Sequence, residues 1–446
     1  MEGTVSLVLF GSFAAMLLMG APITVALSLA ALAAFLFVGE NPIQFVQIAF
    51  TSVGSFPLMA LPAFILAGAL MEATGISRRL IAFAESIAGP FTGGLGAAAI
   101  IACVFFGAIS GSGPATTAAV GMLMIPAMAR RGYDKGYAAS LTAASGGLGI
   151  VIPPSIPMVI FGISAIGLQA PPEAIERFGS FASVSIAKLF IAGMFPGLML
   201  ATSLLVMNAI LSHRRGFVGN GEAWSFAKVV TAGRQGFWAL LAPVVILGGI
   251  YSGWFTPTEA AVVAIFYTLF VGLFIYRSLR WEALFRSLET TTWITGRVLL
   301  ILFAATVFGR VLVTYEVPTL IADSMLALTT NIYLIWLFLI VFLLAVGMFM
   351  ETLAAIMILV QVMLPVAYSV GIDPTHFGIV MICCLAVGFQ TPPLGENLFI
   401  AAGIANRPVE EIAVKALPFV AVNTLAILLI AFFPQISLFL PTLLGY

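Results

Sequence analysis

The chain is 446 residues long, 62% of its residues are hydrophobic and 8% are charged, and its formal net charge is zero. Soluble proteins are about half apolar, so this composition predicts a polytopic membrane protein embedded in a lipid bilayer. The balanced charge, with no Lys or Arg before Arg78, excludes a nucleic-acid partner and a basic membrane-surface patch. Cys103, Cys383 and Cys384 lie in apolar segments without metal-ligand spacing, which argues against a disulfide framework and a zinc site.

Apolar windows of about twenty residues predict membrane spans along the chain. Two further apolar stretches, 96–129 and 332–369, are interrupted near their middle by Ser110 to Thr117 and by Met350 to Thr352. Two short helices that meet at a tip inside the membrane, a re-entrant hairpin, account for each interruption. The alternative is two ordinary spans in each stretch, which requires helices of only about fifteen residues. The uninterrupted spans are predicted at 5–20, 22–38, 57–76, 138–165, 186–212, 236–254, 259–276, 293–315, 376–404 and 416–440.

The basic residues favour the hairpins, because Lys and Arg in short loops stay on the cytoplasmic side. All of the basic clusters can be cytoplasmic only if each interrupted stretch returns to the side from which it entered. Arg177 is then the single basic residue in the loops assigned to the outside, and both termini face outward. Those loops are 39–55, 166–185, 255–258, 316–331 and 370–375.

A repeat of glycine, proline and aspartate positions predicts a duplicated unit. Gly107, Pro126, Gly132, Asp134, Gly149, Pro153, Pro154 and Gly162 recur at offsets of 239 to 241 as Gly347, Pro365, Gly371, Asp373, Gly388, Pro392, Pro393 and Gly403. The charge assignment gives the two copies opposite topology, and inverted repeats with discontinuous helices are typical of secondary transporters. The predicted parts are a first repeat at 1–185 (hairpin 96–129, unwound helix 138–165), a linker helix with a cytoplasmic amphipathic segment at 186–235, and a second repeat at 236–446 (hairpin 332–369, unwound helix 376–404).

Three of these segments carry a family likeness. GAISGSGPATTAAVG at Gly107, GGLGIVIPPS at Gly146 and TPPLGENLFIAAGIA at Thr391 resemble the large membrane subunit, DctM, of tripartite ATP-independent periplasmic (TRAP) transporters, and the likeness extends from Gly20 to the last helix. The resemblance implies an all-α, elevator-type importer of the bacterial inner membrane, driven by sodium. It also implies two partners: a periplasmic binding protein that delivers an organic acid, and a small four-helix membrane subunit on a separate polypeptide.

The residues themselves also favour sodium as the coupling ion, and no other cofactor is expected. Unwound backbone carbonyls and neutral side-chain oxygens suit a small hard cation. The alternative is that Gly and Pro only kink packed helices. The first predicted sodium site combines Ser110, Gly111, Ser112 and Gly113 with carbonyls of Gly149, Val151 and Pro153, and the second combines Gly347, Glu351 and Thr352 with Gly388, Gln390, Thr391 and Pro392.

A carboxylate substrate needs positive potential, which the half-helices that begin after Pro114 and after Pro393 supply at their N-termini. The predicted substrate-binding residues are Thr116, Thr117, Ser155, Gly395, Glu396 and Asn397. Both threonines could instead bond back to helix carbonyls. Glu396 would repel a dicarboxylate unless it is protonated or paired, either with Asn397 or with a distant arginine such as Arg310. Arg310 could instead extend to the membrane interface near Glu316.

Other classes fit less well. A stand-alone sodium-coupled anion symporter is the nearest alternative. An intramembrane serine hydrolase built on Ser110 or Ser112 needs a general base, but His213 and His376, the only histidines, are predicted at opposite membrane faces. An open ion channel does not explain the duplicated broken helices. No Walker A pattern occurs, which leaves an ion gradient rather than ATP as the driver.

Overall fold

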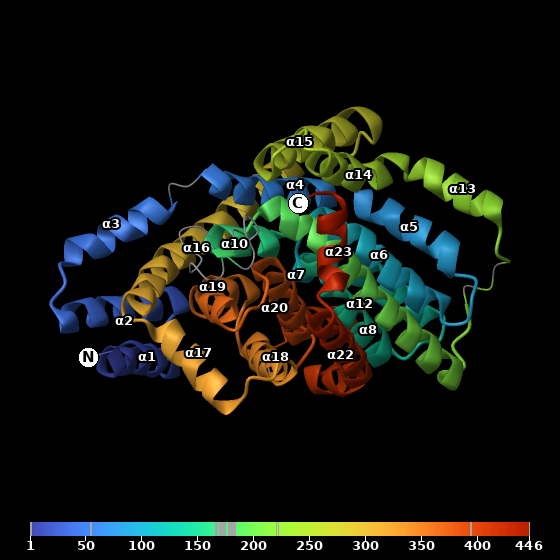
Figure 1. Ribbon diagram of the computed structural model, residues 1–446. Helices are drawn as coiled ribbons and strands as arrows, with labels where there is room; N and C mark the ends of the chain where they lie inside the picture. Colours follow the sequence, from blue (N-terminus) through green and yellow to red (C-terminus); the bar gives the residue numbers. More distant parts are fainter. Residues whose placement is uncertain are drawn as a thin grey trace.

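The computed structural model describes residues 2–53, 56–165, 168, 175–176, 184–219, 221, 223–392 and 395–445, and over these residues it is helical, with no strand. Six of the described helices are long and apolar enough to cross a membrane, or up to nine if each bent pair is counted as one span. The all-α architecture implied by the family resemblance is therefore confirmed, and the apolar helices agree with the membrane protein predicted from composition. The molecule is elongated in the view of Figure 1, with α1 and α2 at one end and α5 and α13 towards the other.

One group of helices forms a frame along the molecule. The long helix α16 (Trp281–Thr314) packs against α2 (Ile23–Val38), α3 (Pro42–Val53) and α4 (Ala60–Ala73). Its other members pack in turn on these: α1 (Glu2–Leu18), η1 (Phe56–Met59), α14 (Phe237–Tyr251), α15 (Pro257–Phe270) with its π-helical end η3 (Val271–Ile275), and α17 (Val317–Leu328).

Two sharp bends connect this frame to a pair of amphipathic helices. The chain turns by 68° between α4 and α5 (Ile76–Ala88), and by 67° between α13 (Phe226–Gln235) and α14. α5 and α13 pack against each other and lie beside each other in Figure 1. The amphipathic helix predicted within 186–235 is thus present as α13, at the end of the chain segment that follows α12 (Ile186–Arg215).

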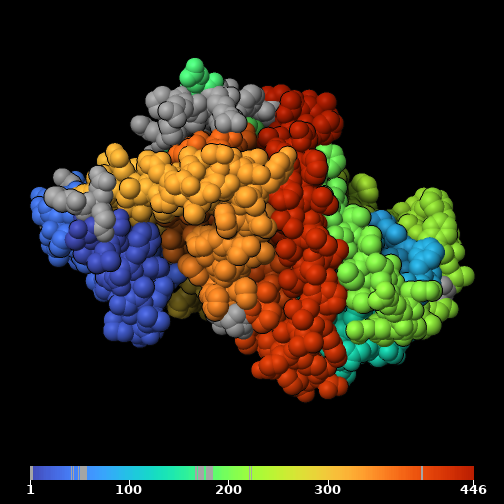
Figure 2. Space-filling model, turned by 60° about the horizontal axis from the view of Figure 1, so that its bottom comes forward, coloured from blue at the N-terminus to red at the C-terminus, as the bar shows by residue number. Residues whose placement is uncertain are grey.

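The second group contains both interrupted stretches and both unwound helices. Its buried centre is made by helices of the two sequence copies in contact, since α8 packs against α21 and α22, and α10 packs against α19 and α20. In Figure 2, α22 forms a red column beside the orange α18 and the green α12. The members are α6 (Gly94–Ser110), α7 (Gly113–Arg130), α8 (Lys135–Gly146), α9 (Leu148–Val151), α10 (Ile156–Ser164), α18 (Ile332–Phe349), α19 (Thr352–Ser369), α20 (Pro374–Gly388), α21 (Glu396–Ala405), α22 (Val409–Phe432) and α23 (Gln435–Leu443).

Equivalent residues of the sequence repeat occupy equivalent local settings. Asp134 and Asp373 are the N-cap residues of α8 and α20, both with φ −60° and ψ 130°, and each carboxylate accepts a backbone N–H of the first helical turn. Pro126 lies inside α7 and Pro365 inside α19. These correspondences extend the repeat from sequence to backbone conformation.

Several predicted boundaries are wrong. The predicted loops 39–55 and 316–331 contain the helices α3 and α17, which are too short for a twenty-residue hydropathy window. The predicted span 416–440 is two helices, α22 and α23, and the span 57–76 ends at α4, with α5 beyond the bend. The predicted span 293–315 begins twelve residues too late, because the first turns of α16 carry charged residues that lower the local hydropathy. Arg177 and most of its loop lie outside the described residues.

Candidate functional site

The first interrupted stretch is a pair of contacting helices, α6 and α7, joined by Gly111 and Ser112. Gly111 has φ +61°, a conformation that glycine adopts without steric cost, and its N–H bonds to the carbonyl of Gly107. Ser112 is the N-cap of α7 and accepts the N–H of Ala115 at 3.4 Å. The interruption is narrower than the predicted Ser110 to Thr117, since α7 is helical from Gly113.

The hydroxyl groups at this tip bond to one another and to the backbone. Ser110 Oγ lies 2.9 Å from Thr116 Oγ1. Thr116 donates to the carbonyl of Ser112 at 2.7 Å, and Thr117 to that of Gly113 at 3.0 Å. Both threonines therefore make the helix back-bonds that the sequence left as the alternative, and only their lone pairs remain for a ligand.

The first unwound helix packs directly on this tip. Its helical turns α9 and α10 are separated at Ile152–Ser155, with a bend of 45° across the break, and the Pro153–Pro154 bond is cis. The N–H of Ile156 donates to the carbonyl of Gly111 at 3.2 Å. Ser155 caps α10 and donates to the carbonyl of Ile150 at 2.6 Å. The structure thus brings together the predicted groups Ser110–Gly113 and Gly149–Ser155.

A close glycine contact holds each tip against its unwound helix. A Cβ added to Gly107 would lie 2.8 Å from Cα of Gly149, and one added to Gly347 would lie 3.2 Å from Cα of Gly388. A Cβ on Gly388 would collide with the backbone of Gly347. The same device therefore recurs at positions that the sequence repeat relates.

The second interruption falls at Met350 and Glu351, as predicted. Glu351 is the N-cap of α19, where its carboxylate accepts the N–H of Ala354 at 3.2 Å. Helix α20 ends at Gly388, and the chain unwinds beyond it. The Thr391 hydroxyl donates to the carbonyl of Val387, four residues earlier, at 2.7 Å. Helix α21 begins at Glu396, and Pro393, which sequence analysis placed before that half-helix, lies outside the described residues.

Three predicted residues of the second copy bury side-chain oxygens that lack any hydrogen-bond partner: Thr352 Oγ1, Gln390 Oε1 and Asn397 Oδ1. All three side chains are at most 2% exposed. Such atoms cost about 1–3 kcal/mol each when unsatisfied, and only seven occur among the described residues. Three of the seven therefore fall on residues predicted from the sequence as cation or substrate ligands, and the other four lie elsewhere.

Asn397 also joins the two copies. Its Nδ2 donates to the carbonyl of Ala143 in α8 at 3.1 Å. A Cβ added to Gly113 would lie 3.1 Å from the ring of Phe389, which places the first tip beside the second unwound helix. The four interrupted segments therefore converge at one centre.

A central cavity of about 220 Å³ opens between these tips and the frame. It is lined by residues 110–115 of the first tip, 351–353 of the second, and Phe389 and Glu396 from the second unwound segment. Frame helices complete it with side chains that sequence analysis missed. These are Glu72 of α4 and Thr290 and Arg297 of α16.

Arg297 supplies the positive charge that sequence analysis did not find at the tips. Its guanidinium nitrogen lies 3.6 Å from the Glu351 carboxylate, and its side chain is 61% exposed, towards the cavity that it lines. It stands at the middle of the 34-residue α16. The predicted span 293–315 puts Arg297 only four residues from its start, whereas α16 begins at Trp281. The suggested alternative, Arg310, lines a different cavity with Glu40 and Tyr315, so it does not pair with Glu396.

Comparisons with known proteins agree with this architecture. Residues 10–436 match the family model described as the tripartite ATP-independent periplasmic transporter, DctM component. An isethionate TRAP transporter permease protein, DctMQ, of Oleidesulfovibrio alaskensis is 44% identical over 97% of the chain, which spans 66% of that relative. The C4-dicarboxylate large permease protein DctM of Rhodobacter capsulatus is 36% identical with 99% of both chains covered, and the sialic acid large permease protein SiaM of Vibrio cholerae is 36% identical with 97% of both covered.

A solved structure shares the fold. The Alcanivorax borkumensis YdaH transporter superposes with a TM-score of 0.64 over 88% of each chain, at 14% sequence identity. At that identity the likeness concerns the arrangement of helices alone.

Proposed function

The chain belongs to the DctM family of TRAP transporters, and on that premise we propose that it is the large permease subunit of a sodium-driven importer of an organic acid. The names of its relatives give three substrates, which are all organic acids: isethionate, C4-dicarboxylates and sialic acid. As a permease it is a polytopic transport protein and not an enzyme. A periplasmic binding protein, a small four-helix membrane subunit and the bacterial inner membrane complete the proposed system.

One observation supports the sodium assignment: buried oxygens without a hydrogen-bond partner occur at Thr352 of the second tip and at Gln390 and Asn397 of the second unwound segment. Hydroxyl and amide oxygens are neutral, and they can coordinate a cation in place of the water molecules of its hydration shell. The carbonyls freed at Ile152–Ser155 and beyond Gly388 add backbone oxygens nearby.

The central cavity has room for a small organic acid. Its 220 Å³ corresponds to roughly seven water molecules at about 30 Å³ each. The N-terminus of the 18-residue α7 lies at the cavity wall, where its backbone dipoles favour a carboxylate. Arg297 offers the only full positive charge among the described residues of the lining. The proposed cation ligands Ser110–Gly113 and Thr352 line the same cavity.

We further propose that the two sequence copies are inverted repeats whose hairpins are re-entrant, and that the tip-bearing group moves against the frame as an elevator. The recurring glycine contacts and N-caps support the repeat. The division into a frame and a tip-bearing group, with the cavity between them, supports the motion.

The test is uptake into proteoliposomes that contain the chain with its small subunit, with sodium, voltage and the binding protein varied one at a time. Two sodium ions with a monoanion move one net charge, worth about 2.3 kcal/mol per 100 mV, so an inside-negative potential should accelerate uptake. Uptake that needs both sodium and the binding protein supports the proposal. Uptake by the chain alone would identify a stand-alone symporter instead.

A further inference from the structure

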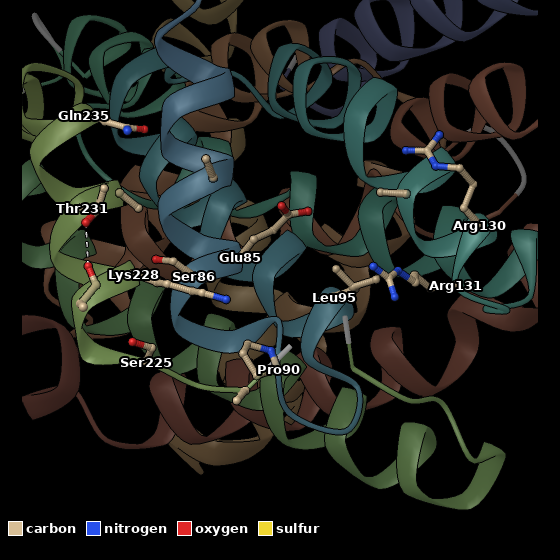
Figure 3. A pocket seen from close by; sticks show the side chains of 15 residues that line it. Glu85, Ser86, Pro90, Leu95, Arg130, Arg131, Ser225, Lys228, Thr231 and Gln235 are labelled. Carbon is tan, nitrogen blue, oxygen red and sulfur yellow. Dashed lines mark hydrogen bonds between the residues drawn. The ribbon is translucent and has the colours of Figure 1, made fainter. Parts of the chain in front are cut away.

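A second cavity opens between α5, α13 and the end of α7, separate from the central one. We call it the α5–α13 pocket; its volume is about 660 Å³. Figure 3 shows Lys228 and Thr231 of α13 on one side, Arg130 and Arg131 on the other, and Glu85 of α5 between them in this view. No residue assigned above to sodium or substrate lines it.

The pocket carries an excess of positive charge. Three basic side chains and one acidic side chain line it. Neither guanidinium, of Arg130 or of Arg131, has an ion pair or hydrogen bond with another described residue. The hydroxyl of Ser225 makes no cap bond to its helix, and it faces the same space with the amide of Gln235. Planar guanidinium groups of this kind bind phosphate with two parallel hydrogen bonds.

Exposed apolar side chains lie on α13 next to the residues that line the pocket. Trp224 is 50% and Phe226 68% exposed, and Val230 follows one turn later on α13. Lys228 and Thr231 of the same helix line the pocket, so α13 has a polar face towards the pocket and an apolar face away from it. Helices of this design lie in the membrane interface with their apolar face among acyl chains. The ligand that fits both surfaces is an amphiphile.

We propose that the α5–α13 pocket binds the headgroup of an anionic phospholipid, with its phosphate at Arg130 and Arg131 and its acyl chains along Phe226 and Val230. The arginines predict the cytoplasmic side for this end of the molecule, which is where bacterial and other membranes present anionic lipids to basic pockets. The bound lipid connects α13 to the end of α7. This inference does not depend on the transported substrate.

The experiment measures lipid binding to the purified full-length chain by native mass spectrometry. Phosphatidylglycerol is titrated against phosphatidylcholine with the same acyl chains, and glycerol phosphate serves as the soluble headgroup. We expect phosphatidylglycerol to bind at least tenfold more tightly than phosphatidylcholine. The double variant R130Q/R131Q should bind phosphatidylglycerol about 25-fold more weakly, at about fivefold for each charge, whereas R130K/R131K retains the preference.

The matched control is R78Q/R214Q, which removes two exposed arginines that do not line the pocket. It should change phosphatidylglycerol affinity less than twofold. Equal binding of phosphatidylglycerol and phosphatidylcholine, or an equal loss in the control, would overturn the proposal. So would displacement of the lipid by glycerol phosphate at the same concentration, because that result identifies a site for a soluble anion. All variants are surface substitutions, and their thermal unfolding checks that they fold.

Discussion

Replacing Thr352 with Val tests the sodium assignment by the sign of its effect. Valine has the shape of threonine, so the substitution removes a buried hydroxyl that has no partner. An unsatisfied hydroxyl costs about 1–3 kcal/mol. Without sodium, T352V should therefore be more stable than the parent chain by about 1 kcal/mol. With sodium, the variant loses a ligand.

The sodium-dependent part can be worked out from linkage. A ligand that binds a charged group contributes about 1.5 kcal/mol, so its loss weakens sodium binding about tenfold. At a sodium concentration ten times the parent dissociation constant, the parent gains about 1.4 kcal/mol and T352V only about 0.4 kcal/mol. The gain in stability on adding sodium should thus fall by about 1 kcal/mol.

The assay is thermal unfolding of the purified chain over a sodium series, with potassium replacing sodium at constant ionic strength. The half-saturating sodium concentration for uptake should rise about tenfold in parallel. Thr375→Val is the matched control, because Thr375 is also fully buried with an unpartnered hydroxyl but lies at the start of α20, away from the tips. A sodium response in T352V equal to that of the control would refute the assignment.

The remaining predictions concern packing, the cavity charge and pH. Gly388→Ala should destabilise the chain by about 1–3 kcal/mol, since the added Cβ meets the backbone of Gly347. In the control Gly403→Ala of α21, the added Cβ has nothing within 4 Å, so this variant should be neutral or more stable by about 0.5–1 kcal/mol. Equal melting temperatures of the two variants would contradict this prediction. Arg297→Gln should cost about 1 kcal/mol of stability, because the Arg297 side chain is 61% exposed but the Glu351 side chain that it faces is only 30% exposed. It should also lower uptake at least tenfold; normal uptake would remove Arg297 from the site. Burial opposes ionisation of Asp134, but hydrogen bonds from Lys415 (2.6 Å) and the Tyr137 N–H outweigh it and hold the pKa of Asp134 below its ordinary value. The ionised Asp134 carboxylate therefore stabilises the folded state fully above the unfolded pKa of about 3.9, and this stabilisation is lost as pH falls through the folded pKa. Asp134→Asn keeps the N-cap but removes the titrating group, so the free energy of unfolding should fall less steeply at acid pH. An unchanged acid limb would show that the Asp134–Lys415 pair is not responsible.

The interruptions could be predicted from sequence because they are local. Glycine at Gly111 and the proline pair at Pro153 act on the backbone around them, whatever packs nearby. The spacing of the repeat then indicated which interruptions belong together, and the structure brings Gly107 against Gly149 and Gly347 against Gly388.

The cavity wall contributed by the frame could not be predicted in the same way. Glu72 and Arg297 belong to α4 and α16 and lie inside the predicted spans 57–76 and 293–315. An ionisable residue inside a span was the one available signal, and it does not show which cavity the side chain lines. Arg297 appears central only when α16 is seen to begin at Trp281, before the apolar window starts. The unpartnered state of Thr352 is also a tertiary property, because it depends on what the neighbouring helices leave unfilled.

The charges of the central cavity give the proposed sodium coupling an electrostatic reason. Glu72, Glu351 and Glu396 face the space with Arg297 as their only counter-charge among the described lining residues. Two unit charges about 6 Å apart interact by about 3 kcal/mol at an effective dielectric constant near 20, so an organic acid beside unneutralised carboxylates loses about a hundredfold in affinity for each such contact. Three carboxylates and one guanidinium leave the described lining with two net negative charges, which two sodium ions at the neighbouring tips would offset without changing any contact to the acid. In the proposed mechanism, coupling between ion and substrate follows from electrostatics within one cavity, and we expect it to be strongest where the acid reaches Glu396, the exposed carboxylate at the start of α21.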